Sequence, residues 1–172
     1  LSSDHKIDKT NNFHKIINNC TKILDKNKII TFGIKPDQPD KNFGYIKKGG
    51  VFDNKSKTFY VDEFKEKPSL EIAKKYLKNK KFFWNAGIFF FKANLMLNEL
   101  SIYNKSILKQ SEESIKYSKK DLDFLRLPKK QFSKIISKPI DIAVIEKSNN
   151  VIFKSFDIGW SDVGSWPSIF NL

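Results

Sequence analysis

The chain has 172 residues, of which 40% are hydrophobic and 14% aromatic, and its formal net charge is +13. This length suits one globular domain, and the composition excludes a disordered chain. The sequence has no apolar run long enough to span a membrane and no signal-peptide pattern. The single cysteine, Cys20, excludes an internal disulfide. These features favour a cytoplasmic protein with no membrane partner.

The positive charge does not indicate a nucleic-acid partner. Arg126 is the only arginine among the 32 basic residues. Phosphate and base recognition usually use clustered arginine side chains, whose planar forks match phosphates and base edges. The lysines are instead scattered along the chain, as on the solvated faces of an ordinary fold, so we expect no nucleic-acid binding.

The hydrophobic pattern predicts alternating helices and strands. Apolar residues at helical spacing predict a helix from Phe13 to Leu24, and a continuous apolar run predicts a buried strand at residues 28–32. Further strands are expected at residues 42–46, 58–64, 88–91 and 151–158, and further helices at residues 70–77, 94–100, 106–117 and 140–146. We expect the strand that begins at residue 42 to break at Gly49 and Gly50, and Ser69 to cap the helix after Pro68. The interleaving of the two element types indicates an α/β fold.

Two aspartates are candidate metal ligands. Asp162 stands in the segment GWSDVGSW, whose glycines allow sharp turns and whose tryptophans are unusual in a surface loop. Asp4 lies near the start of the chain, where a strand before it would put it at the edge of a sheet. Two carboxylates at one sheet edge would hold Mg²⁺ against substrate phosphates. The alternative for each aspartate is a capping or turn residue.

Two other segments carry candidate substrate-binding groups. Glu66 and Lys67 precede Pro68, which can break a strand and let both side chains serve one site. A carboxylate accepts hydrogen bonds from sugar hydroxyls, and an ammonium group binds phosphate. Asn85 offers a donor and an acceptor, and Gly87 leaves room for a ligand. The alternatives are a solvated strand end for the first segment and a tight turn for the second.

Other common sites are excluded by the sequence. It has no Cys/His cluster for zinc, no Gly-x-Ser-x-Gly elbow and neither of the glycine-rich nucleotide patterns.

Seven segments, in this order, resemble the bacterial-type mannose-1-phosphate guanylyltransferases, a branch of the sugar nucleotidyltransferases. They are LSSDH, ITFGIKP, FGYI, FKEKP, WNAGIF, IDIAVIEK and GWSDVGSW, which together extend from residue 1 to residue 166. The resemblance implies a partial Rossmann-like nucleotide-diphospho-sugar transferase fold, with a mixed, mostly parallel sheet flanked by helices. It also implies a reaction in which GTP and mannose 1-phosphate give GDP-mannose and pyrophosphate with Mg²⁺ as cofactor.

The resemblance also assigns roles to particular residues. Asp4 and Asp162 would hold the metal, with Lys67 on the sugar phosphate as the third catalytic group. The residues implied in substrate binding are Gly44, Tyr45, Glu66, Lys67, Asn85, Gly87 and Asp141. Of these, Asp141 matches a motif of the family for which we expect only a supporting role from a helix.

One family feature does not occur in these 172 residues: the glycine-rich amino-terminal loop that cradles the nucleotide triphosphate. We therefore interpret residues 1–172 as the sugar- and metal-binding portion of a catalytic domain, truncated at both ends, and expect it alone not to turn over. Two alternatives remain: another sugar-1-phosphate nucleotidyltransferase, or a non-catalytic paralogue that binds a sugar phosphate. The oligomeric state is open, with a homo-oligomer among the alternatives.

Overall fold

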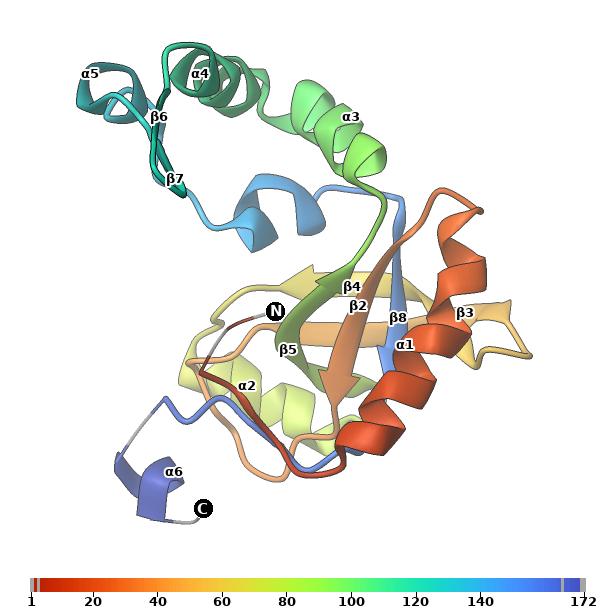
Figure 1. The fold of residues 1–172 in the computed structure, drawn as a ribbon. Coiled ribbons are helices and arrows are strands. Elements are labelled where there is room, and N and C mark those ends of the chain that lie inside the picture. The colour runs from red at the N-terminus through yellow and green to blue at the C-terminus, as the bar shows by residue number, and fades with distance from the viewer. Residues whose placement is uncertain (1, 3, 165, 171–172) are drawn as a thin grey trace. The chain divides into compact units, whose positions relative to one another are not determined.

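The computed structural model describes residues 2, 4–164 and 166–170. Within it the chain forms two compact units (Figure 1). The first consists of Leu1–Lys92 with Asn149–Leu172, and the second of Ala93–Ser148. The length of the chain predicts one domain, and within it residues 93–148 form a compact unit of their own, inserted in the sequence between the two segments of the first.

The first unit is built on a closed sheet of five strands. In the order of their hydrogen bonding these are β2 (Ile29–Ile34), β5 (Phe82–Phe90), β3 (Tyr45–Asp53), β4 (Thr58–Lys65) and β8 (Val151–Ser155), and β8 pairs again with β2. Two helices belong to the same unit, α1 (Thr10–Leu24) and α2 (Leu70–Lys78). The expected mixed α/β fold is therefore confirmed.

The strand directions differ from the expected mostly parallel sheet. In this sheet β2 and β8 run parallel, while β2–β5, β3–β5, β3–β4 and β4–β8 are antiparallel. The reason lies in the connections, because β3 reaches β4 through a short turn at residues 54–57, which permits an antiparallel neighbour. A parallel neighbour needs a longer crossover, and β2 and β8 are far apart in the sequence.

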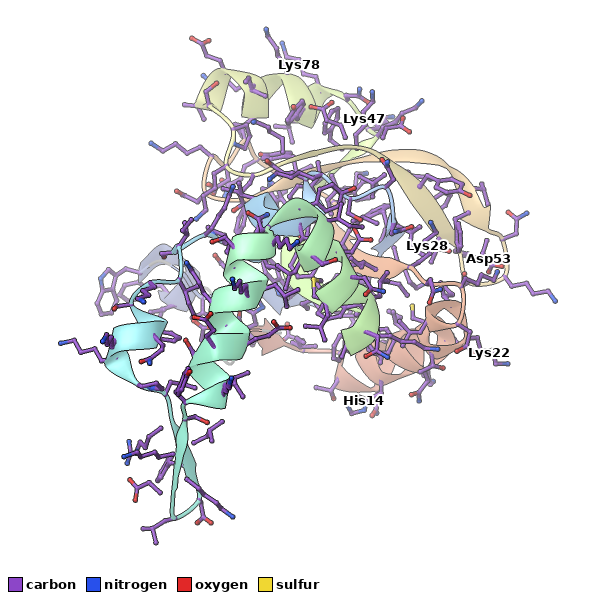
Figure 2. The ribbon with its side chains drawn as sticks, turned by 90° about the horizontal axis from the view of Figure 1, so that it is seen from above. His14, Lys22, Lys28, Lys47, Asp53 and Lys78 are labelled. Carbon is purple, nitrogen blue, oxygen red and sulfur yellow. The ribbon has the colours of Figure 1, made fainter. Side chains whose placement is uncertain are left out.

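Each helix of the first unit covers its own group of core residues. Cys20 and Ile23 of α1 pack with Ile30 of β2 and Ile152 of β8. Ala73 of α2 packs with Tyr45, Phe82 and Trp84 in a second cluster. Charged side chains of these elements lie on the outside, as Figure 2 shows for Lys22 of α1 and Lys78 of α2, both of which are exposed.

Two strands run through glycine-containing motifs, one of which was expected to break its strand and the other of which had a tight turn as its alternative interpretation. β3 continues across Gly49 and Gly50, because shifts of register against β4 between residues 47 and 53 absorb the irregularity without ending the strand. The motif at residues 84–87 lies inside β5 and forms no turn before it. Here a register shift between Thr31 and Gly33 of β2 accommodates Gly87, whose φ is +65°.

The second unit is mainly helical. It contains α3 (Ala93–Tyr103), α4 (Lys105–Lys116), the hairpin of β6 (Lys119–Asp121) and β7 (Phe124–Arg126), α5 (Lys129–Phe132) and the π-helix η1 (Asp141–Ile145). The sequence analysis located α3, α4 and η1. It missed the hairpin, whose turn carries Leu122 at a φ of +52° without the usual glycine or asparagine.

Short elements complete the first unit. β1 (Lys6–Ile7) and β9 (Trp160–Ser161) form an antiparallel pair, and α6 (Trp166–Phe170) follows. Figure 1 shows the red amino-terminal segment beside the blue segment that leads to α6. Among the described residues, no helix combines the length and hydropathy needed to cross a membrane.

Candidate active site

The pairing of β1 with β9 brings the two candidate metal ligands to one end of a short ladder. Lys6 is paired with Ser161 and Ile7 with Trp160. Asp4 lies two residues before Lys6, and Asp162 directly follows Ser161, so both carboxylates leave the same end of this antiparallel pair. The sequence analysis placed them after two strands at one sheet edge. They instead lie before one strand and after the other, because an antiparallel ladder joins a strand's start to its partner's end.

The backbone around this ladder is closely packed. The amides of Asp8 and Lys9 donate to the carbonyl oxygens of Gly159 and Ile158, at 3.1 and 2.9 Å. Gly159 has a φ of +61°, and a Cβ there would lie 2.6 Å from the Asp8 carboxylate. Glycine is therefore required at position 159 both by conformation and by space.

Asp162 follows β9 in a segment of irregular backbone next to Gly164. Val163 adopts a φ of +51°, and its amide donates to the Ser161 hydroxyl at 3.2 Å. A Cβ on Gly164 would lie 2.7 Å from Asp162 Oδ2. The turn thus holds the carboxylate against a bare glycine backbone. Asp162 is half-buried, whereas Asp4 is exposed.

Carboxylate oxygens are the ligands that Mg²⁺ prefers, and it usually takes one or two of them together with water and substrate phosphates. Asp4 and Asp162 fit this pattern, since they are two hard donors at the same end of one ladder. The described residues contain no group of three or more His, Cys, Asp or Glu side chains that could hold a metal by themselves. A metal here would therefore complete its coordination with substrate oxygens.

A second group of candidate residues meets at the base of the β3–β4 hairpin. Gly44 precedes β3 and Glu66 follows β4, and a Cβ on Gly44 would lie 2.5 Å from Glu66 Oε2. The same Cβ would lie 3.2 Å from Asn85 Cβ and 3.5 Å from Asn85 Nδ2. Glu66 and Asn85, from separate segments, therefore both border the position where a side chain at residue 44 would begin, and a Cβ there would require one of them to move.

Asn85 is held by hydrogen bonds through its backbone and its side chain. Its amide donates to the Gly44 carbonyl at 2.7 Å. Its side-chain oxygen accepts from the Thr31 hydroxyl at 3.1 Å and from the Gly87 amide at 3.2 Å. These bonds fix which end of the carboxamide is oxygen, and Nδ2 then lies 3.5 Å from where a Cβ on Gly44 would be. Asn85 is buried, so this orientation is set by the fold.

Glu66 and Lys67 lie where the sequence analysis expected the strand to end. β4 ends at Lys65, and Lys67 takes a φ of +45° before the buried Pro68. The regular alternation of strand side chains is therefore lost at this pair. Ser69 then caps α2 by accepting from the Ile72 amide at 3.4 Å, as expected.

Tyr45 differs from its expected place in the sugar pocket. Its side chain is fully buried, with its ring 5.3 Å from that of Tyr76. Its hydroxyl donates to the Asp40 carbonyl at 2.9 Å and accepts from the Asp40 amide at 3.1 Å. The core therefore takes the Tyr45 side chain, and the backbone of the preceding residue, Gly44, remains beside Glu66 and Asn85.

Asp141 belongs to the second unit and begins η1, where the Glu146 amide donates to its carbonyl oxygen at 2.8 Å. Three of the residues that follow it, Ala143, Val144 and Ile145, are buried. The expected helix at residues 140–146 is therefore present as a π-helix, a form that is rare and often found at functional positions.

One residue that the sequence did not single out, His5, lies between the two groups. The Trp160 indole N–H donates to His5 Nδ1 at 3.1 Å, and the Trp160 ring lies 5.8 Å from that of Phe43, next to Gly44. A Cβ on Gly87 would lie 3.9 Å from His5 Cε1. Only the position of His5 beside Asp4 could have drawn attention to it in the sequence.

Burial shifts the pKa values of three groups, Cys20, Lys154 and Tyr76. Burial raises the pKa of the Cys20 thiol to about 11 and lowers the pKa of Lys154, whose ammonium donates to the Ser56 carbonyl oxygen. Burial, together with the nearby Glu63 carboxylate, raises the pKa of Tyr76 to about 12.

Comparison with known proteins finds matches over the whole chain. The family model described as nucleotidyl transferase matches residues 1–172. Mannose-1-phosphate guanylyltransferase 2 of Escherichia coli O157:H7 is 40% identical over 177 residues, which cover 100% of this chain and 37% of that protein. Mannose-1-phosphate guanylyltransferase of Escherichia coli strain K12 is 35% identical over 174 residues, or 100% of this chain and 36% of that protein. The chain thus spans little more than a third of the length of these curated relatives.

Solved structures agree with the fold. A structure of mannose-6-phosphate isomerase from Helicobacter pylori superimposes with a TM-score of 0.83 at 30% identity, covering 92% of this chain and 62% of that one. A structure named mannose-1-phosphate geranyltransferase, from Thermus thermophilus, gives a TM-score of 0.81 at 23% identity, covering 98% of this chain and 47% of that one. The second likeness supports the fold alone.

Proposed function

The chain belongs to the nucleotidyl transferase family, and we propose that it carries the sugar-phosphate and metal side of a site that makes GDP-mannose and pyrophosphate from GTP and mannose 1-phosphate. One observation carries this proposal. Gly44, Glu66 and Asn85, which come from three segments, meet at the base of one hairpin, while Asp4 and Asp162 leave the same end of one ladder. Relatives named mannose-1-phosphate guanylyltransferase, matched over the whole chain, favour mannose and GTP.

In the proposed reaction a phosphate oxygen of mannose 1-phosphate attacks the α-phosphorus of GTP in line, and pyrophosphate leaves from the opposite side. Such transfers depend on positioning and charge stabilisation more than on covalent chemistry by the protein. Bound Mg²⁺ would neutralise charge on the triphosphate. Asp4 and Asp162 are the residues that we assign to hold it.

The sugar would be recognised by groups that the fold orients. Glu66 accepts hydrogen bonds from sugar hydroxyls, and Asn85 donates through Nδ2, since its oxygen is already occupied by Thr31 and Gly87. Lys67 binds the sugar phosphate as a cation. Gly44 and Gly87 let the ligand approach the backbone. Tyr45 supports Gly44 from the core. Asp141 is assigned a supporting role in the second unit.

We also infer a cytoplasmic location and no nucleic-acid partner. The single Cys20 is a buried free thiol, which suits a reducing compartment. The oligomeric state stays open, with a homo-oligomer among the alternatives.

The experiment that tests the proposal joins this chain to the amino-terminal segment of a close relative and measures pyrophosphate release with Mg²⁺. The panel crosses GTP, UTP and dTTP with mannose 1-phosphate and glucose 1-phosphate. Activity confined to GTP with mannose 1-phosphate is the expected result. Activity with another pair would instead identify a different sugar-1-phosphate nucleotidyltransferase. Silence from a folded chimera would favour a non-catalytic sugar-phosphate-binding protein.

A further inference from the structure

His5 lies between the two parts of the candidate site, the metal end with Asp4 and Asp162 and the sugar end with Gly44, Glu66, Asn85 and Gly87. Its half-buried ring meets that of Trp160 edge-to-face, with centroids 5.1 Å apart and planes at 83°. On another side, Cε1 lies 3.9 Å from where a Cβ on Gly87 would be. A single imidazole therefore contacts the β9 segment and faces the backbone of β5.

The hydrogen bond from Trp160 fixes the tautomer of this imidazole. An indole nitrogen can only donate, so His5 Nδ1, which accepts at 3.1 Å, carries no proton. A neutral ring then has its proton on Nε2. Among the described residues, no hydrogen bond of His5 Nε2 is seen, and the adjacent Cε1 is the atom that faces Gly87. The Nε2–H group is therefore a donor held in a fixed orientation beside the proposed sugar site.

We propose that His5 Nε2–H donates a hydrogen bond to the phosphate of the sugar 1-phosphate, and that Trp160 is the positioning residue that sets this donor. The inference rests on the proposed function and adds a substrate contact to it. A donor suits this position better than a base, because a phosphate monoester has a second pKa near 6 and its attacking oxygen needs no deprotonation at neutral pH. Hydrogen bonds to charged groups are among the stronger ones in proteins.

The contacts of Trp160 hold its indole in a fixed geometry against the His5 imidazole. Its backbone is paired with Ile7 in the β1–β9 ladder, two residues from His5, and its ring also packs on Phe43. Movement of either segment would break the indole–imidazole bond. The pair thus aligns the amino-terminal segment, the loop before β3 and the ladder with one another.

The first test is spectroscopic and needs no turnover. Long-range ¹H–¹⁵N NMR of the 172-residue chain at neutral pH should give the Nε2–H tautomer for His5. Trp160→Phe keeps an aromatic ring but removes the indole donor, and it should shift His5 toward a tautomer mixture. A His5 ring protonated on Nδ1 in the unmodified chain would overturn the inference at once.

The second test measures binding of mannose 1-phosphate by calorimetry with Mg²⁺ present, with inorganic phosphate as a second probe. His5→Asn retains an acceptor near the position of Nδ1 but has no group at Nε2. It should weaken binding of mannose 1-phosphate about 10- to 100-fold, the effect of one hydrogen bond to a charged group. His5→Gln, which extends a donor toward the Nε2 position, should bind better than His5→Asn.

The outcomes separate this inference from the proposed function. If the unmodified chain binds mannose 1-phosphate and both His5 variants bind it equally well, the His5 contact is wrong while the sugar site stands. If the unmodified chain binds neither probe, the sugar-phosphate site and the His5 contact fail together. Thermal unfolding of each variant checks that the fold is retained.

Discussion

The two ends of the candidate site are held in different ways. At the sugar end, Gly44, Glu66 and Asn85 lie at the base of strands in the closed sheet, and Asn85 is fixed by Thr31 and by backbone amides. At the metal end, Asp4 and Asp162 lie beside a ladder of two residue pairs. Gly159 and Val163, on the same segment as Asp162, have positive φ values.

Because of this difference, we expect the two ends to respond differently to ligands and to substitutions. The sugar end is preorganised by the same sheet that forms the core, so its geometry should hold without ligand. The metal end lies on a ladder of two residue pairs outside this sheet, and metal and substrate phosphates would complete it. Substitutions at the sugar end should therefore alter affinity through contact geometry, whereas those at the metal end should alter turnover and metal dependence.

The largest effect is expected for Asp162→Asn in the active chimera. Loss of a metal-binding carboxylate should lower kcat by on the order of 10³-fold, because several kcal/mol of charge stabilisation are lost. Thermal unfolding should be nearly unchanged, since the side chain is not part of the core. Asp157→Asn is the matched control, because Asp157 lies on the same segment with 90% of its side chain exposed. Near-normal kcat for Asp162→Asn would remove this residue from the metal site.

Gly44→Ala tests the sugar end. The new methyl group would lie 2.5 Å from Glu66 Oε2 and 3.2 Å from Asn85 Cβ, so one of these side chains must move. Overpacking of this kind costs about 1–3 kcal/mol, and we expect mannose 1-phosphate to bind about 10-fold or more weakly. Gly50→Ala is the control, because no atom lies within 4 Å of its added Cβ. Equal affinity of the two variants would show that Glu66 and Asn85 do not need their observed positions.

Gly159→Ala tests the ladder that carries the metal end. Its φ of +61° disfavours alanine, and the methyl group would lie 2.6 Å from Asp8 Oδ2. Strain in this region costs of order 1–3 kcal/mol, which corresponds to a Tm lowered by roughly 2–10 °C for a chain of this size. Calorimetric unfolding measures this, and the Mg²⁺ concentration for half-maximal activity should rise. An unchanged Tm together with an unchanged Mg²⁺ requirement would contradict the importance of this turn.

A smaller effect is expected for Thr31→Val, which removes the hydroxyl that orients Asn85. One neutral hydrogen bond contributes about 0.5–1.5 kcal/mol, so binding of mannose 1-phosphate should weaken about two- to tenfold. Thr58→Val is a matched control, because Thr58 is equally buried but its hydroxyl meets Ser56 Oγ at 3.0 Å. If both variants bind equally, the orientation of Asn85 does not depend on Thr31.

The sequence anticipated the elements with strong periodicity and the segments with local chemical character. The helix that ends at Leu24 and the strand end at Pro68 follow from apolar spacing and from proline geometry, which are local properties. The strand directions, the burial of Tyr45 and the bond between Trp160 and His5 depend on contacts between residues far apart in the chain. No local pattern distinguishes a tyrosine that lines a pocket from one that fills the core.

The proximity of Gly44 and Glu66 could be predicted only in part from the sequence. The motifs FGYI and FKEKP could each be recognised, but their meeting required the register of β3 against β4, in which Tyr45 is paired with Lys65. Farther along the same hairpin the register shifts between Lys47 and Asp53, a stretch that contains Gly49 and Gly50, where the sequence predicted a break. The sequence pattern therefore did not reveal the pairing of the two strands.

The smallest effect is expected for Asp53, at the turn of the β3–β4 hairpin. A substitution there tests whether the geometry of the sugar end depends on this turn or on the sheet alone. Asp53 accepts from the Ser56 hydroxyl at 2.6 Å and from its amide at 2.8 Å, and these bonds, aided by Lys26, lower its pKa from 3.8 to about 2. The folded state thus favours the ionised carboxylate more than the unfolded state does. The resulting stabilisation is complete above pH of about 4 and is lost as the pH falls toward 2. Asp53→Asn should therefore lower the Tm slightly at neutral pH, and the difference from the unmodified chain should vanish near pH 2.

Because Gly44, Glu66 and Asn85 are fixed by the sheet at the opposite end of the hairpin, the Asp53→Asn variant should bind mannose 1-phosphate with unchanged affinity at neutral pH. Calorimetric titration beside the unmodified chain measures this. A loss of affinity in this variant would mean that the turn and the sugar end act as one unit, and that the sheet alone does not preorganise the site.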